Sequence, residues 1–344
     1  MKKVRFGVVG TNFITDWVIA GAREDARFEL AAVCSRTRER GEEFARKHGI
    51  PHVFTSLEEM TAGDTVDAVY IATPNCMHAR QSIYCMSRGK HVLCEKPMAS
   101  NAAEARAMIG ASQRFGVTLM EAMKSTLSPN FRAVSENLRR VGRVRRYFAS
   151  FCQYSSRYDK FKEGTVLNAF RPELSNGAIM DIGVYAIYPA VVLFGAPRSI
   201  EAQGVLLSSG ADGQGAVNML YDGMNATVLY SKIADSLLPS EIEGEQGNIL
   251  VDRIQTPTDV RFYARTAPAS GRGARPKPEQ LSVASAYDEY YYEIAEFIDL
   301  VLAGEVSSRV NSHAASLAVM EIVDEVRRQI GVHYPADDNP MLEM

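Results

Sequence analysis

The chain has 344 residues, of which 46% are hydrophobic and 23% charged, and its formal net charge is -3. A chain of this length predicts two domains. The slightly acidic balance provides no general attraction for nucleic acid, so we expect no nucleic-acid partner. No apolar run approaches the length of a membrane span, so we also expect no membrane role.

The beginning of the chain bears on localisation. Residues 1–3 lead directly into an apolar strand over residues 4–9, which leaves no room for the apolar segment of a signal peptide. The five cysteines are odd in number and contain no C-x-x-C pair, which is typical of reduced thiols. We therefore expect a cytoplasmic protein.

Apolar strands and helices alternate through residues 1–122. The expected strands span residues 4–9, 28–34, 52–54, 66–72, 91–94 and 117–120. Continuous apolar runs separated by helical segments are typical of a doubly wound parallel sheet. We predict an α/β domain of this type over residues 1–122.

The pattern changes after residue 123. Apolar and polar residues alternate in strands expected at 143–153, 198–207, 215–221, 225–233, about 239–251 and 258–263. Alternation with glycine-containing turns is typical of an antiparallel sheet with one covered face. A mobile loop is expected at 266–278, and helices at about 287–303 and 313–330. We predict an α+β domain over residues 123–344 whose large open sheet is mostly antiparallel.

The turn after the first strand is typical of dinucleotide binding. It lies between a strand and a helix, which is the context that the G-x-G-x-x-G fingerprint of a Rossmann domain requires. Only the first glycine of the fingerprint is present, because Asn12 and Thr15 occupy the other two positions. The Asn12 amide could donate to a phosphate. The alternative is a strand-to-helix turn that binds no ligand. The predicted cofactor-binding residues here are Gly10, Thr11, Asn12, Phe13 and Ile14.

The end of the second strand bears on the choice of cofactor. It carries Ser35 and Arg36, and no acidic residue follows until Glu39. A carboxylate at this position would repel a 2′-phosphate, whereas a guanidinium would bind it in a forked geometry. The alternative is that Arg36 and Arg38 are the solvated start of a helix. We predict a preference for NADP(H), with NAD(H) as the second choice.

Two later strand ends carry polar side chains. Ligands in an open parallel sheet bind outside the carboxyl ends of the strands, so we expect these residues to line the cofactor site. The alternatives are a solvated lysine at position 96 and a histidine on the helix surface at position 78. The residues are Thr73, Pro74, Asn75, His78, Glu95, Lys96 and Pro97.

These motifs occur in a combination that closely resembles the Gfo/Idh/MocA oxidoreductase family. The matching segments are residues 7–11, 72–78, 95–97 and 177–185. The last segment is most similar to the dihydrodiol and sugar dehydrogenase branch, while Asn12, Thr15 and Asn176 depart from the family pattern. The resemblance implies a nicotinamide cofactor on the first domain and a sugar, polyol or related hydroxy compound on the second.

Hydride transfer at a carbinol carbon needs a group that takes or gives the hydroxyl proton. We predict that Lys96 is this group, because the cationic oxidised nicotinamide would favour its neutral form. Tyr185 lies one helical turn after Asp181, so we predict Tyr185 as proton donor or relay and Asp181 as an orienting acceptor. The alternatives are a helix N-cap for Asp181 and a core tyrosine for Tyr185.

The loop before Asp181 supplies candidates for substrate binding. Arg157, Asn168 and Arg171 could bind substrate hydroxyls, although polar residues in long loops are commonly only solvated. We predict no metal site.

The leading hypothesis is an NAD(P)-dependent dehydrogenase or reductase that acts on CH–OH groups of a sugar, polyol or diol. The alternatives are a non-catalytic regulator of the same fold that senses a dinucleotide or sugar, and an NAD-dependent glycosidase. A regulator would need neither Lys96 nor Tyr185. Apolar residues on both faces of the strands at 217–221 and 226–230 predict a homodimer or homotetramer through the C-terminal sheet.

Overall fold

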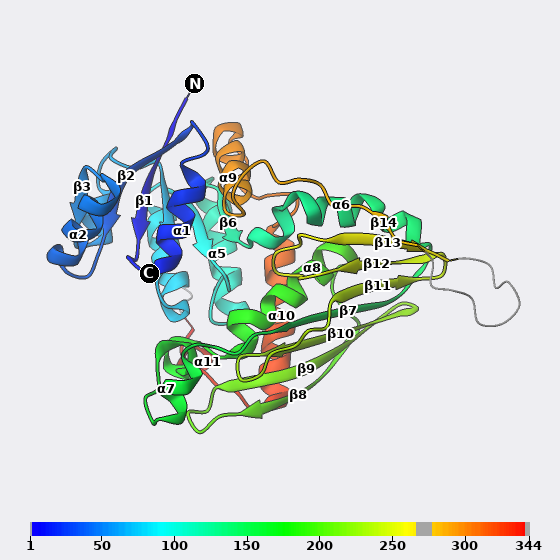
Figure 1. The fold of residues 1–344 in the computed structure, drawn as a ribbon. Helices are drawn as coiled ribbons and strands as arrows, with labels where there is room; N and C mark the ends of the chain where they lie inside the picture. The colour runs from blue at the N-terminus through cyan, green and yellow to red at the C-terminus, as the bar shows by residue number, and fades with distance from the viewer. Residues whose placement is uncertain (1, 266–276, 341–344) are drawn as a thin grey trace, which may run out of the picture.

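The structure is a computed structural model that describes residues 2–265 and 277–340. Its first sheet has six parallel strands in the order β3-β2-β1-β4-β5-β6 (Figure 1). The strands are β1 (Val4–Val9), β2 (Phe28–Cys34), β3 (His52–Phe54), β4 (Ala68–Ile71), β5 (His91–Glu95) and β6 (Leu119–Ala122). The order reverses between β1 and β4, which opens a crevice at their carboxyl ends. The predicted doubly wound sheet is confirmed.

Local chemistry sets the ends of the surrounding helices. These are α1 (Phe13–Ala22), α2 (Arg38–His48), α3 (Leu57–Thr61), α4 (His78–Ser87) and α5 (Ala102–Phe115). The Ser56 hydroxyl accepts from the backbone N–H of Glu59, and Asn101 caps α5 through Glu104 N–H in the same way. Gly116 ends α5 with φ of +65°, a conformation that favours glycine.

Helix α9 (Tyr291–Ala303) follows the second sheet in the chain but packs on the first. Its Ile294, Phe297 and Ile298 are buried in one cluster with β1, and the rings of Phe297 and Phe6 lie 5.7 Å apart. The first core therefore includes residues from beyond the second sheet. The division at residue 122 stays a prediction.

The second sheet has eight strands in the order β14-β13-β12-β11-β7-β10-β9-β8. They are β7 (Val144–Cys152), β8 (Ser199–Leu206), β9 (Asp212–Tyr221), β10 (Met224–Ser231), β11 (Ser240–Gly244), β12 (Gly247–Val251), β13 (Val260–Ala264) and β14 (Glu279–Gln280). Within the described residues, β7 and β10 are the one parallel pair of this sheet, so the sheet is mostly antiparallel, as predicted.

Two strand predictions need comment. The single strand expected at 239–251 is wrong, because the chain turns at Glu245 and Gln246 and pairs β11 with β12. Glycines flank this turn, and a Cβ at Gly244 would lie 2.2 Å from the Val141 carbonyl oxygen. Most of the loop expected at 266–278 lies outside the described residues, and the short β14 was not expected.

Helices fill the space between the second sheet and the first domain. The longer ones are α6 (Pro129–Asn137), α8 (Val184–Phe194) and α10 (His313–Ile330), and shorter ones are α7 (Tyr158–Lys162) and α11 (Pro335–Asp338). Helix α8 contacts β7 and β10, while α10 contacts both β8 and α5. In Figure 1, α8 and α10 lie behind the strands of this sheet. The inner face of the sheet is therefore covered.

The stretch Pro172–Phe194 is long and apolar enough to cross a membrane by length and composition alone, with a mean hydropathy of 1.8. This corrects the expectation that no run reaches that length. However, 72% of its most apolar window is buried inside the protein, which is typical of a core helix.

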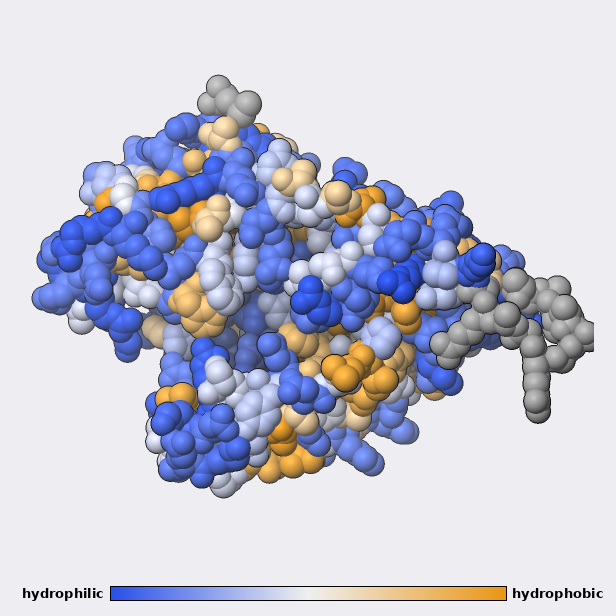
Figure 2. Space-filling model, viewed as in Figure 1, coloured by the Kyte–Doolittle hydropathy of each residue, from blue (hydrophilic) through white to orange (hydrophobic). Residues whose placement is uncertain are grey.

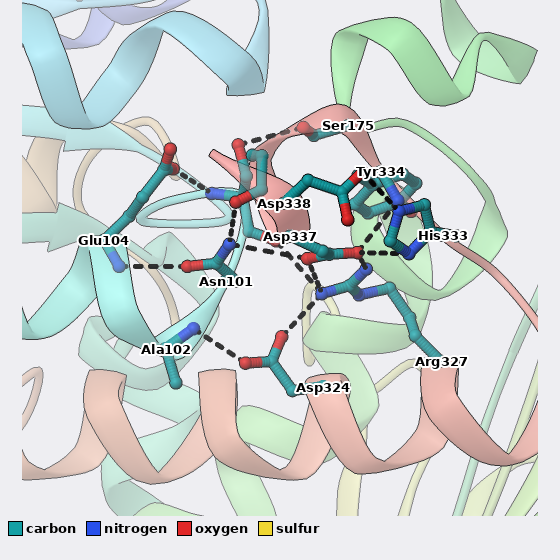
Figure 3. Close-up of polar contacts among 12 residues, drawn as sticks. Asn101, Ala102, Glu104, Ser175, Asp324, Arg327, His333, Tyr334, Asp337 and Asp338 are labelled. Atoms are coloured by element: carbon teal, nitrogen blue, oxygen red, sulfur yellow. Dashed lines mark hydrogen bonds and ion pairs between the residues drawn. The ribbon is translucent and has the colours of Figure 1, made fainter. Parts of the chain in front are cut away.

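The C-terminal segment is attached to the loop that follows β5 (Figure 3). Arg327 of α10 has a side chain only 4% exposed and donates to Asp337 and Asp324, each at 2.7 Å. One of its nitrogens also donates to the carbonyl oxygen of Ser100 at 3.4 Å. A buried guanidinium therefore holds α11 against the strand-end loop.

Candidate active site

A cleft of about 1250 Å³ opens at the carboxyl ends of the parallel strands, and residues from both domains line it. Figure 2 shows the surface hollowed between the Rossmann lobe and the lobe that carries α7. This is the topological switch point, where an open α/β sheet binds its ligand. All the predicted site residues line this cleft except Pro97.

The turn between β1 and α1 forms one end of the cleft. Gly10 has φ of +105°, and a Cβ there would lie 2.5 Å from the Ala72 carbonyl oxygen. The Asn12 amide donates to that same oxygen at 2.9 Å, while its Oδ1 accepts from the N–H of Ile14 at 2.9 Å. Asn12 therefore shapes the turn and caps α1. Its amide nitrogen carries two hydrogens, so donation to a phosphate stays a prediction. The buried Thr15 hydroxyl donates to the Gly10 carbonyl oxygen, so the turn accommodates Thr15 at the third glycine position of the fingerprint.

The end of β2 forms the next part of the cleft. Ser35 is buried there, and the exposed Arg36 and Arg40 both line the cleft. Arg40 lies in the first turn of α2 and was not predicted, because Arg36 precedes the helix and helical spacing does not relate the two. Two guanidinium groups beside a hydroxyl fit a 2′-phosphate.

The loops after β4 and β5 are tied together by His78. Its Nδ1 lies 2.9 Å from the carbonyl oxygen of Pro97 and its Nε2 lies 2.9 Å from that of Thr73. The side chain is fully buried, and burial lowers the pKa of His78 below its usual value. The alternative of a surface histidine is therefore wrong. His78 therefore holds the loops after β4 and β5 at a fixed separation.

The loop after β4 also contacts the second domain. The Asn75 amide donates to the Ser175 carbonyl oxygen at 2.8 Å and to Asn176 Oδ1 at 3.0 Å. Ser175 has φ of +56°, and its hydroxyl donates to that of Ser100 at 2.9 Å. These contacts link the segments that carry Asn75, Lys96 and Asp181.

Lys96 lies at the centre of the cleft and reaches across the domain boundary. Its Nζ donates to Asp181 Oδ1 at 3.0 Å and to the Asp181 backbone carbonyl at 2.9 Å. Asp181 lies in a π turn (Ile179–Gly183) before α8, so the N-cap alternative is wrong. The other carboxylate oxygen, Oδ2, forms an ion pair with Lys232. Burial would raise the pKa of Asp181, but the charges of Lys232 and Lys96 outweigh it and hold that pKa well below its usual range.

Tyr185 joins this group from the first turn of α8. The Nζ of Lys96 lies 5.0 Å from the centre of its ring, and Phe151 packs edge-on against the same ring at 5.8 Å. Burial, followed by the nearby Glu95 carboxyl, raises the pKa of Tyr185 well above its usual value. Among the residues that the structure describes, none hydrogen-bonds to its hydroxyl. This hydroxyl faces the cleft as a neutral donor.

A buried acidic group lies next to Lys96 on the same strand. The Tyr70 hydroxyl donates to Glu95 Oε1 at 2.5 Å, and burial raises the pKa of Glu95. Nearby, Lys124 forms an ion pair with Glu289 and lies 4.2 Å from the centre of the Tyr290 ring. Lys124 and Tyr290 line the cleft as well, and no sequence pattern predicted them.

The predicted substrate residues all line the second-domain side of the cleft. Arg157 also lies 5.5 Å from the ring of Phe13, so it spans from the second domain to the first. Arg171 forms a 3.5 Å contact with Glu173. Residues that we did not predict also line this side, namely Gln153, Leu167, Arg253, Gln255 and Thr256, while Trp17 and Gln81 line the cleft from the first domain. Within the described ranges, no group of three or more His, Cys, Asp or Glu side chains could hold a metal ion.

A dinucleotide cleft with a lysine, a carboxylate and a phenol meeting at its domain boundary defines a two-domain oxidoreductase. Residues 4–123 match the model of an oxidoreductase family with an NAD-binding Rossmann fold. Residues 133–250 match the GFO/IDH/MocA C-terminal domain. The chain belongs to the GFO/IDH/MocA oxidoreductase family.

Individual relatives are consistent with this assignment. The chain is 49% identical over 334 residues to scyllo-inositol 2-dehydrogenase (NADP(+)) of Bacillus subtilis (strain 168), covering 97% of this chain and 99% of the relative. It is 32% identical over 347 residues to trans-1,2-dihydrobenzene-1,2-diol dehydrogenase of Danio rerio, covering 97% and 99%. The protein is therefore an NAD(P)-dependent oxidoreductase, and neither the sensing regulator nor the glycosidase is favoured.

Solved structures of other proteins have a similar fold. A levoglucosan dehydrogenase in complex with NADH and levoglucosan has a TM-score of 0.83 at 20% identity, covering 96% of this chain and 98% of that chain. KijD10, a 3-ketoreductase from Actinomadura kijaniata, has a TM-score of 0.79 at 24% identity with the same coverage. At these identities the likeness concerns the fold alone.

Proposed function

We propose that this oxidoreductase uses NADP(H) to interconvert a hydroxyl and a carbonyl on a cyclic polyol or vicinal diol, with Lys96 handling the hydroxyl proton. The observation that carries the proposal is the contact of Lys96 with Asp181 at 3.0 Å inside the cleft, 5.0 Å from the Tyr185 ring. A general acid or base must lie within hydrogen-bond reach of the proton that it transfers.

The cofactor would be held by the first domain. Gly10 and the start of α1 would hold the pyrophosphate, and Ser35, Arg36 and Arg40 would hold a 2′-phosphate. The bound nicotinamide supplies the hydride acceptor in oxidation and the donor in reduction. The relative from Bacillus subtilis is named for NADP(+), which supports the same preference here.

Lys96 would accept the hydroxyl proton in oxidation and return it in reduction. Tyr185, with its neutral hydroxyl, would donate a hydrogen bond to the reacting oxygen or relay its proton. Asp181 binds Lys96 through both a carboxylate oxygen and its backbone carbonyl, which fixes the amine in one direction. The three groups therefore have separate roles in moving one proton.

The names of the relatives support a ring-shaped substrate. Scyllo-inositol and trans-1,2-dihydrobenzene-1,2-diol are both six-membered carbon rings with neighbouring hydroxyls. Asn168, Arg157 and Arg171 supply amide and guanidinium donors for such hydroxyls. The exposed Trp17 ring supplies an apolar surface in the same cleft.

We also propose that the protein is a homodimer or homotetramer that assembles through the outer face of the second sheet. Val205, Leu206 and Leu220 on that sheet are 43–53% exposed, and Leu238 in the loop after β10 is 56% exposed. Figure 2 shows hydrophobic side chains gathered over β8 to β10. An exposed apolar sheet face of this kind is commonly covered by a partner subunit. Light scattering at micromolar concentration tests this, and a monomeric mass would rule it out. A cytoplasmic location remains part of the same proposal.

The test of function is a panel of inositols, sugars and cyclic diols with NADP+ and NAD+, followed by NADPH or NADH absorbance. We expect turnover with a cyclic polyol or vicinal diol and a preference for NADP+. Sugar release without net NADPH formation would instead support the glycosidase. Absence of turnover with every hydroxy compound, by a protein that binds NADP+, would overturn the proposed substrate class.

A further inference from the structure

A second lysine shares Asp181 with Lys96. Lys232 directly follows β10, and its side chain is only 3% exposed. Its ammonium forms an ion pair with Asp181 Oδ2 and lies 5.4 Å from the centre of the Phe170 ring, while Lys96 binds Oδ1 at 3.0 Å. One carboxylate therefore lies between two amines, one from each domain.

The burial of Lys232 requires an explanation. Lysine is almost never fully buried unless it is paired, because removing its charge from water is costly. Lys232 does not line the cleft, whereas Lys96, Asp181 and Tyr185 do. It therefore has no direct route to a substrate, and its charge can reach the reaction only through Asp181.

We infer that Lys232 is a positioning residue that balances the charge of Asp181 and so lets Lys96 release its proton. This inference rests on the proposed role of Lys96. With both amines protonated, the group of three carries one net positive charge. When Lys96 loses its proton, Lys232 and Asp181 remain as a neutral ion pair. Without Lys232, the same step would leave the Asp181 carboxylate, whose side chain is 33% exposed, with no ammonium group paired to it, which is unfavourable.

Other groups around Lys96 do not provide this balance. At the end of β5, burial raises the pKa of Glu95, and on the neighbouring β6 it raises that of Glu121 to about 7. Burial lowers the pKa of His78, and burial raises that of Tyr185. Each of these shifts favours the neutral form of its group. Asp181 is the carboxylate that contacts the amine directly.

The test measures alcohol oxidation as a function of pH in Lys232→Met and Lys232→Gln. We expect the pH of half-maximal rate to rise by about 1 to 3 units in both, the size of shift that a neighbouring charge produces. Gln still donates a hydrogen bond to Asp181 without a charge, so it serves if the Met variant does not fold. Lys232→Arg keeps the charge and should keep the wild-type pH profile.

Lys90→Met is the matched control. Lys90 is also buried, and its Nζ donates to the Gly63 carbonyl oxygen at 2.7 Å, but it does not line the cleft. Its removal should change thermal stability without moving the pH profile. An unchanged profile in a folded, cofactor-binding Lys232→Met or Lys232→Gln protein would overturn the inference, as would an equal shift in Lys232→Arg. Absence of turnover by the wild type would count against the proposed function instead.

Discussion

The Nζ of Lys96 and the Oδ1 of Asp181 lie 3.0 Å apart, although one follows β5 of the first sheet and the other precedes α8 of the second domain. Neither domain alone contains the complete group. Contacts that hold the two domains together, such as those of Asn75 with Ser175, are therefore expected to affect turnover as well as stability.

Cofactor preference should depend on Arg36. Replacing it with alanine removes a charge-assisted contact to a 2′-phosphate, which should cost on the order of 1.5 to 3 kcal/mol, or more than tenfold in NADP+ affinity. NAD+ affinity should change little. The single tryptophan, Trp17, lines the cleft, so its fluorescence on titration reports both affinities.

Arg38→Ala is the control for Arg36→Ala. Arg38 is exposed on the same helix start but does not line the cleft, so its loss should leave both affinities near those of wild type. Equal affinities of the wild type for NADP+ and NAD+ would contradict the preference. If Arg36→Ala retained the preference for NADP+, Arg36 would not be its source and Arg40 would be the next residue to replace.

Stability should depend strongly on Arg327. Its side chain is 4% exposed and pairs with Asp324 and Asp337, so Arg327→Met removes the guanidinium that two partly buried carboxylates share. Breaking such a pair typically costs about 3 to 5 kcal/mol. Arg328→Met is the comparison, because Arg328 is 71% exposed and its one ion-pair partner among the described residues is Glu325. Chemical denaturation should separate the two variants by at least about 2 kcal/mol, and equal stabilities would refute the role given to Arg327.

Glu121 should make stability fall as the pH rises. It is 1% exposed on β6, its Oε1 accepts from the N–H of Met98, and burial raises its pKa from 4.5 to about 7. Because the folded state holds this proton more tightly, its contribution is fully present below the unfolded value and is lost through about pH 7. Glu121→Gln cannot ionise and should therefore gain about 2 kcal/mol relative to wild type between about pH 5 and pH 8.

Denaturation at several pH values checks this prediction. The exposed Glu42 provides the control, because Glu42→Gln should follow the wild-type pH dependence. A constant difference between Glu121→Gln and wild type across the range would show that this carboxyl does not titrate as expected.

Features set by local chemistry could be predicted from the sequence. Ser56 and Asn101 cap helices because their side chains reach a backbone N–H three residues away, and that reach requires no knowledge of the rest of the fold. The end of β5 could be located because Pro97 cannot continue a strand. The four-residue spacing of Asp181 and Tyr185 predicted that they are close, although Asp181 lies in the π turn before α8 and not on the same α-helix.

Features that depend on distant contacts could not be predicted. Lys232 follows an apolar strand and looks like a solvated strand end, but β10 lies beside the π turn that carries Asp181. His78 is buried because two loops 19 and 5 residues away present carbonyl oxygens to its ring. The hairpin at Glu245 was missed because alternation continues across it, and only its flanking glycines mark the turn.

The most direct test of the account is the turnover of Lys96→Met with a polyol that the wild type oxidises. Met keeps about the length and apolar stem of Lys but removes the amine, so the fold and most NADP+ affinity should survive. We expect the rate to fall by about a hundredfold to ten-thousandfold or more, with loss of the rise in rate with pH. Turnover within a few-fold of wild type would contradict the role of Lys96 and would leave Tyr185 as the proton-transfer group.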